Sequence, residues 1–155
     1  MKTPKEYFAS RGVGYFLSIL VILLAAFAMV LYTKHGINIY SNAYNGKIYL
    51  CCWLAIAFAA VSLCVDLLPV SFAEELVKPA RAISFLLLLY ATLQYVLTQI
   101  MFIGAVAVAI DVDQYSPLIP GFALTISCLI LGAVFALAGV CLDRWRPWCK
   151  SSKVG

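Results

Sequence analysis

The stretch that decides the fold is "GVGYFLSILVILLAAFAMVLYT", residues 12–33, which carries no charged side chain. As a helix, roughly 20 apolar residues are long enough to cross about 30 Å of hydrocarbon. Lys2, Lys5 and Arg11 precede it, as they would in a cleavable signal peptide, but the apolar run continues past Ala28, where such a peptide would be cut. The stretch therefore predicts a first membrane span.

Three more apolar runs follow, at residues 48–70, 82–110 and 118–142. Hydrophobic residues make up 65% of the chain and charged residues 12%, a balance that a water-soluble domain could not bury. The runs are continuous, whereas the strands of a membrane barrel alternate between polar and apolar residues. We therefore expect an all-α fold, a four-transmembrane-helix bundle that forms one integral membrane domain over residues 1–155.

Lysine and arginine residues are distributed unequally between the two sides of this predicted bundle. With both termini cytoplasmic, two of them lie outside, Lys34 and Lys47. Nine lie inside: Lys2, Lys5, Arg11, Lys78, Arg81, Arg144, Arg146, Lys150 and Lys153. The formal net charge of +4 then reflects orientation and attraction to anionic lipid head groups, not nucleic-acid binding. We expect a multi-pass protein of a plasma or inner membrane.

The predicted cytoplasmic connection, "PVSFAEELVKPAR", contains a capping-box pattern in which Glu74 follows Ser71 by three residues. This pattern predicts a short amphipathic helix along the membrane surface, ended by Pro79. Such a helix is either a docking element for a cytoplasmic partner or a simple amphipathic connector.

Small residues recur at steps of three and four in the second and fourth runs, as expected where helices approach closely in lipid. The second run carries Cys52, Ala55, Ala59, Ser62 and Asp66 in this pattern. The fourth carries Gly121, Thr125, Cys128, Gly132, Ala136 and Gly139. These stripes predict that the second and fourth helices make the closest contacts of the bundle.

The six cysteines include no C-x-x-C motif and no zinc-type spacing with the single histidine, His35. Cys51 and Cys52 form the one adjacent pair, and Cys149, beside Lys150, is a candidate for lipid attachment. The sequence thus predicts no catalytic residue, no metal site and no cofactor.

Polar residues inside the apolar runs are the remaining candidates for function. Asp66 has two interpretations, an interfacial residue paired with Arg81, a head group or water, or a proton or cation site. Gln94 and Gln99 lie deeper in the third run, together with Thr92 and Thr98. A buried amide needs a partner, so the glutamines are interpreted as interhelical contacts, the lining of a solute path, or a head-group site.

The two glutamines point in different directions, because five residues at 100° each separate them by about 140° around a helix. Gln94 shares an edge with Tyr90 and Thr98, and Gln99 shares another with Thr92 and Tyr95. One edge can face the chain's own bundle. The other then faces a second chain or an aqueous path.

Three functional hypotheses follow. The first is a non-enzymatic accessory or assembly subunit of a larger, transport-related membrane complex, whose partners are the lipid bilayer and another membrane chain of the same or a different kind. The second is a self-assembled transporter or channel lined by Gln94, Gln99 and Asp66. The third is a membrane thiol-redox enzyme that uses Cys51 and Cys52.

Overall fold

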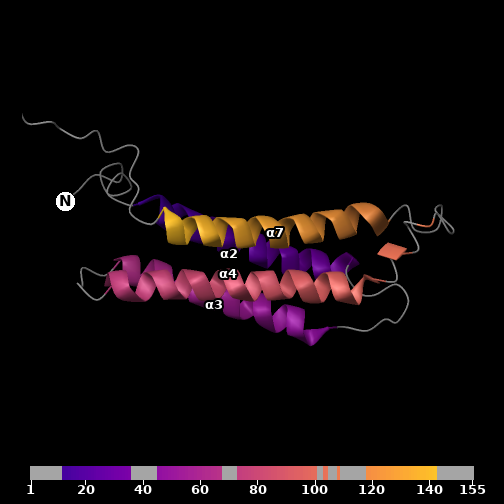
Figure 1. Ribbon diagram of the computed structural model, residues 1–155, viewed down its shortest axis with the longest axis horizontal. Coiled ribbons are helices and arrows are strands. Elements are labelled where there is room, and N and C mark those ends of the chain that lie inside the picture. The colour runs from indigo at the N-terminus through magenta and orange to yellow at the C-terminus, as the bar shows by residue number, and fades with distance from the viewer. Residues whose placement is uncertain are drawn as a thin grey trace, which may run out of the picture.

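The computed structural model describes residues 12–35, 45–67, 73–100, 103–104, 108 and 118–142. These residues contain four long helices, α2 (Val13–His35), α3 (Gly46–Leu67), α4 (Ala73–Thr98) and α7 (Ile119–Cys141). Figure 1 shows them lying side by side along one axis, with successive helices running in opposite directions. The start of α2 and the end of α7 therefore lie at the same end of the bundle, as do the end of α3 and the start of α4. We call this end the Arg81 end.

All four helices are long and apolar enough to cross a membrane. About a third of each candidate span is buried inside the bundle, and large apolar side chains cover much of the remaining surface. Leu23, Leu50 and Leu86 are each about 60% exposed. Such a surface is costly in water but suits contact with lipid, so the fold is that of a four-helix membrane bundle.

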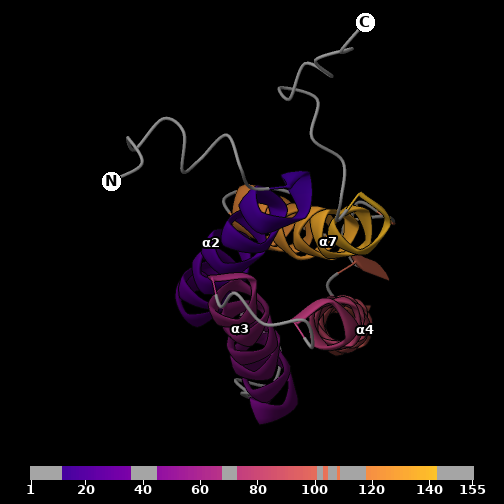
Figure 2. The ribbon, with the colours of Figure 1, turned by 90° about the vertical axis from the view of Figure 1, so that its left-hand side faces the viewer.

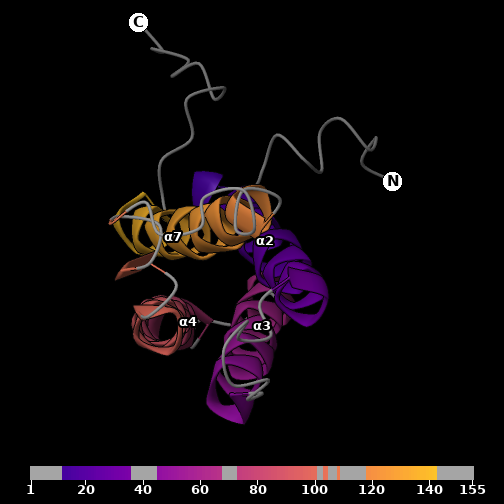
Figure 3. The same ribbon diagram turned by 90° about the vertical axis from the view of Figure 1, so that its right-hand side faces the viewer.

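The helices form a ring in which α2 and α4 each contact both α3 and α7. The view along the bundle in Figure 2 and the opposite view in Figure 3 place α3 and α7 at opposite corners. The prediction that the second and fourth helices make the closest contacts is therefore wrong. A stripe of small residues shows that a helix has a close-approach face, but it does not identify the helix on the other side.

Helix α4 begins earlier than the sequence predicted and includes Pro79 in its interior. The expected separate surface helix ending at Pro79 is thus replaced by the first turns of one continuous helix. Pro79 has no amide to bond to the Glu75 carbonyl, and its ring crowds that carbonyl, yet α4 continues through it without a break in its assignment. Ser71, the predicted cap, lies outside the described residues, as does Cys149.

The predicted third run extended to Ile110, whereas the regular helix α4 ends at Thr98, and residues 105–107 and 109–110 lie outside the described residues. The amide of Gln99 is shared between the carbonyls of Tyr95 and Val96, at 3.1 Å each, which marks the end of the regular helix. Helical bonding resumes beyond it, from the Ile103 amide to the Gln99 carbonyl at 2.9 Å. The described residues beyond Thr98 thus keep some helical hydrogen bonds, at the end of the bundle opposite to the Arg81 end.

Candidate functional site

One arginine side chain joins all four helices at the Arg81 end. Arg81 of α4 donates from Nε to Ser18 Oγ of α2 at 2.9 Å and from one terminal nitrogen to the Gly139 carbonyl of α7 at 3.3 Å. Its other terminal nitrogen forms an ion pair with the Asp66 carboxylate of α3. Every helix of the bundle thus contributes a group to one guanidinium.

Serine hydroxyls extend this network into the bundle. Ser62 of α3 donates to the Ala59 carbonyl at 2.7 Å and lies 3.3 Å from Ser18. Ser84 of α4 lies 3.0 Å from the Ala55 carbonyl of α3. These hydroxyls are all buried, and each has a partner, as a low-dielectric interior requires.

The two charges of the network are buried to different degrees. The Arg81 side chain is 2% exposed and the Asp66 side chain 24%. An unpaired guanidinium at this depth would carry a desolvation cost of several kcal/mol, which the carboxylate and the two neutral acceptors offset. This network holds the four helices in fixed positions. Asp66 forms an ion pair with Arg81, one of the possible partners that the first interpretation of this residue named.

A second polar cluster lies at the opposite end of the bundle. The Asn45 amide donates to the Tyr32 hydroxyl of α2 at 2.9 Å, and Asn45 Nδ2 donates to Thr98 Oγ1 of α4 at 3.2 Å. Thr33 of α2 and Tyr49 of α3 bring their hydroxyls within 3.0 Å of each other. Asn45 also caps α3, because its side-chain oxygen accepts the Lys47 amide at 3.1 Å.

Aromatic rings fill the space behind this cluster. Tyr95 of α4 meets Tyr32 edge to face, with ring centroids 5.9 Å apart, and stacks on Phe122 of α7 at 5.5 Å. Tyr32 and Tyr95 are both almost completely buried. Tyr32 also contacts Tyr49 of α3, with ring centroids 6.4 Å apart, so ring contacts join all four helices here.

Apolar side chains fill the core between the two polar clusters. Leu88 and Ala91 of α4, Ala55 of α3, Val21 of α2 and Leu129 of α7 are each at most 1% exposed. Asp66 lies at one end of this layer, and Gln94 and Gln99 lie toward the other. The bundle therefore does not bring the proposed path-lining residues together within one chain.

The two glutamines of the third run lie in different environments. Gln99 is 3% exposed and faces the interior of the bundle, whereas Gln94 is partly exposed at its surface. The hydroxyls of Thr92 and Thr98 are bonded within α4, to the Leu88 and Gln94 carbonyls at 2.8 and 2.7 Å. No hydrogen bond joins the Gln94 side-chain amide to any group in the part of the chain that the structure describes.

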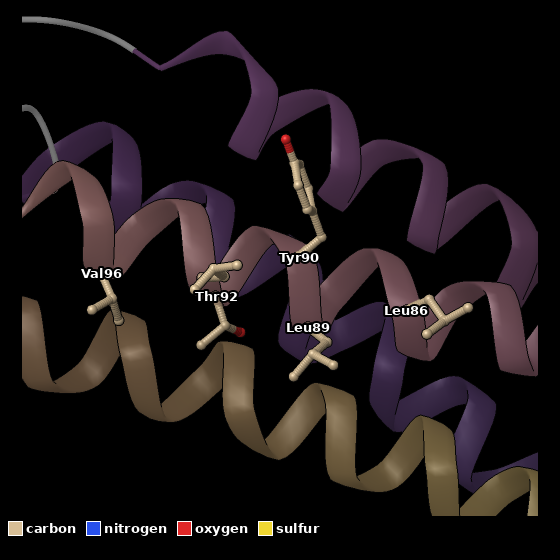
Figure 4. Close-up of a pocket in the computed structure, with 6 residues that line it drawn as sticks. Leu86, Leu89, Tyr90, Thr92 and Val96 are labelled. Atoms are coloured by element: carbon tan, nitrogen blue, oxygen red, sulfur yellow. The ribbon is translucent and has the colours of Figure 1, made fainter.

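An open hollow of about 510 Å³ runs along the outer surface of α4. It is lined by Leu86, Leu89, Tyr90, Thr92, Leu93 and Val96. Figure 4 shows Leu89, Thr92 and Val96 pointing toward α7, while Tyr90 points to the other side, toward α3. The lining is almost entirely apolar, so the hollow suits a hydrocarbon occupant.

The residues of the predicted packing stripes lie at buried positions: Ala55, Ala59 and Ser62 in α3, and Cys128, Gly132, Ala136 and Gly139 in α7. The α7 stripe faces α2 and α4. A Cβ built on Gly132 would lie 3.3 Å from Leu88 of α4 and 3.7 Å from Leu24 of α2.

Cys51 and Cys52 are free thiols, and both are buried. Within the described ranges no three His, Cys, Asp or Glu residues are close enough to hold a metal ion. His35 ends α2, and its side chain lies outside the described set.

The central role of Arg81 was missed in the sequence, where it counted only as a charge flanking a span and as one possible partner of Asp66. A signal was present, because Arg81, Ser84, Leu88, Ala91 and Tyr95 recur at steps of three and four, and all are buried. Comparison of the chain with models of known protein families, with curated proteins and with solved structures finds no match.

Proposed function

We propose that this chain is a non-enzymatic accessory or assembly subunit that associates with another membrane chain through the surface of α4 around Gln94. The observation that carries the proposal is the environment of this side chain. Its amide is partly exposed on a helix long and apolar enough to span a membrane, and no described group hydrogen-bonds to it. Lipid tails offer no hydrogen bond, whereas a neighbouring chain can.

The buried networks support the same proposal, because they make the chain a preformed unit. Arg81 joins the four helices at one end, and the hydrogen bonds of Asn45 together with the contacts between aromatic rings join them at the other. A partner would therefore bind a surface that is already ordered, without an additional cost for arranging the helices.

A transporter path lined by Gln94, Gln99 and Asp66 receives less support, because apolar side chains separate Asp66 from the glutamines inside one chain. We infer the orientation from the lysine and arginine excess, which places the Arg81 end in the cytoplasm. Both termini and the exposed Lys78 then belong to the cytoplasmic side of a plasma or inner membrane.

The proposal is tested by native mass spectrometry of the full chain, extracted with its own lipids into polymer-bounded discs. We expect a mass above the 17.0 kDa of one chain. Gln94→Leu should weaken the assembly about 3- to 30-fold, the range given by one interhelical hydrogen bond of about 0.6 to 2 kcal/mol. Thermal stability of the isolated chain should not change.

Thr92→Val is the matched control, because the Thr92 hydroxyl is already bonded to the Leu88 carbonyl of its own helix. This variant should assemble like the original protein. A wild-type mass of one chain with no companion would overturn the proposal. An assembly that is unchanged by Gln94→Leu would overturn the role of this surface.

A further inference from the structure

We propose that the partner of this chain is a second copy of itself, and that the two copies pack in parallel along α4 with Gln94 facing Gln94. This inference rests on the association proposed above and names the partner at the same surface. It gives a symmetric dimer whose two-fold axis runs along the membrane normal.

Residues that recur at alternating steps of four and three form one stripe on α4 that includes Gln94. The members are Ile83, Leu87, Tyr90, Gln94 and Leu97, and we call them the Gln94 stripe. At 100° per residue, all of them lie within about 60° of Gln94 around the helix. Ile83, Tyr90 and Leu97 are 37%, 42% and 51% exposed, and the other two are partly exposed. A seven-residue repeat of this kind is typical of the seam between two parallel helices.

Two polar side chains of the Gln94 stripe lie one turn apart. No described group hydrogen-bonds to the Gln94 amide or to the Tyr90 hydroxyl. Figure 4 shows Tyr90 projecting from α4 on the side opposite to Leu89 and Thr92. A hydrocarbon neighbour would leave both groups unpaired, so the stripe requires a partner that brings polar groups of its own.

A second copy brings such groups to the required depth. The excess of lysine and arginine at one end gives every copy the same orientation in the membrane. A given residue then lies at the same depth in each copy, so the second copy presents a glutamine opposite Gln94. A carboxamide both donates and accepts, and each Gln94 can therefore donate from Nε2 to Oε1 of the other.

The position of Gln94 within the stripe also fixes the register. A shift of one heptad would place its amide against Leu87 of the second copy, which offers no side-chain hydrogen bond. A single polar residue in an apolar seam therefore favours the in-register pair, as it does in parallel coiled coils. An unlike chain would match this surface only if it carried a polar side chain at the same depth.

The open hollow on α4 adjoins the Gln94 stripe. Tyr90 belongs to both, and Leu93, which also lines the hollow, precedes Gln94 in the chain. Apolar side chains of the second copy can enter this space as the stripes pack together. The interface thus combines an apolar recess with the paired amides beside it.

The first test is native mass spectrometry of the full chain in polymer-bounded discs. We expect a complex of twice the 17.0 kDa of one chain, with no other protein in it. A complex with an unlike chain, or with more than two copies, would overturn this inference and leave the association through α4 standing. A single chain would overturn both.

The second test mixes two variants, Gln94→Glu and Gln94→Lys, one of which carries a peptide tag so that the masses differ. Each variant alone places like charges opposite each other, whereas the mixed pair places unlike charges there. We expect the mixed dimer to be about tenfold tighter than either like-charged dimer. Mixed dimers at the share that random pairing gives would overturn the inference. The same exchange at Thr92, about 160° around the helix from Gln94, is the control and should give random pairing.

A third test avoids charged variants, which can fail to fold. In a chain with Cys64, Cys141 and Cys149 replaced by serine, Gln94→Cys and Thr92→Cys are compared with a short thiol-reactive cross-linker in intact membranes. The cysteines that remain, Cys51, Cys52 and Cys128, are buried. Only Gln94→Cys should yield a covalent dimer. Equal yields from the two variants, or no dimer from Gln94→Cys, would overturn the inference.

Discussion

The guanidinium of Arg81 and the carboxylate of Asp66 form an ion pair between α4 and α3 in which the two partners are unequally buried. Arg81 is enclosed by groups from three other helices, whereas Asp66 keeps about a quarter of its side-chain surface exposed. Water or a head group can therefore approach the acid but not the base. Loss of one partner should have different consequences from loss of the other.

We predict that Asp66→Leu destabilises the bundle more than Arg81→Met does. The first change leaves a buried guanidinium without its counter-charge, and breaking a buried pair in this way costs about 3 to 5 kcal/mol. The second leaves a carboxylate that can turn to water, so its cost comes mainly from the two hydrogen bonds to Ser18 and the Gly139 carbonyl, together about 1.5 to 3 kcal/mol. Unfolding of each variant in mixed micelles measures the difference.

The double variant Asp66→Leu, Arg81→Met provides the control for this prediction. It removes both charges, so its stability should exceed that of Asp66→Leu alone. A double variant whose loss equals the sum of the two single losses would show that the pair is not coupled.

The sequence was sufficient to predict the four long apolar helices, because the bilayer sets their length. The predicted runs begin and end within three residues of α2, α3 and α7. The third run differs, since its start was placed after Lys78, Pro79 and Arg81. These residues resemble a loop in composition, but one of the charges is neutralised inside the bundle, and the helix includes the proline.

The partners of each helix could not be derived from periodicity. The stripes containing Ala55 and Gly132 show buried faces in α3 and α7, but each of these faces meets α2 and α4. The position of Gln94 also depended on the predicted bounds, because α4 ends at Thr98, which places this residue one turn from the end of the regular helix. Both relationships depend on tertiary packing.

We predict that side-chain volume at Gly132 determines how closely α7 approaches α4. A Cβ there would lie 3.3 Å from Cδ1 of Leu88, so Gly132→Ala requires only a small shift of a side-chain end. Gly132→Leu cannot be accommodated in this way and should cost about 1 to 3 kcal/mol or more. Gly104→Leu is the control, because a Cβ at Gly104 meets no atom within 4 Å. Equal thermal stabilities of the two leucine variants would contradict this packing.

We predict separable roles for the side-chain oxygen and nitrogen of Asn45. The oxygen accepts the Lys47 amide at the start of α3, and the nitrogen donates to Thr98 of α4. Asn45→Asp keeps the cap but loses the donor, at a cost of about 0.5 to 1.5 kcal/mol. Asn45→Ala loses both and should cost about 1 kcal/mol more.

Thr98→Val distinguishes the two roles, because valine cannot accept the Asn45 hydrogen bond. In that background Asn45→Asp should cost almost nothing, while Asn45→Ala should still lose the cap. Unfolding free energies of the resulting double-mutant cycle measure the coupling between the ends of α3 and α4. An unchanged cost of Asn45→Asp in the Thr98→Val background would mean that the nitrogen binds another group.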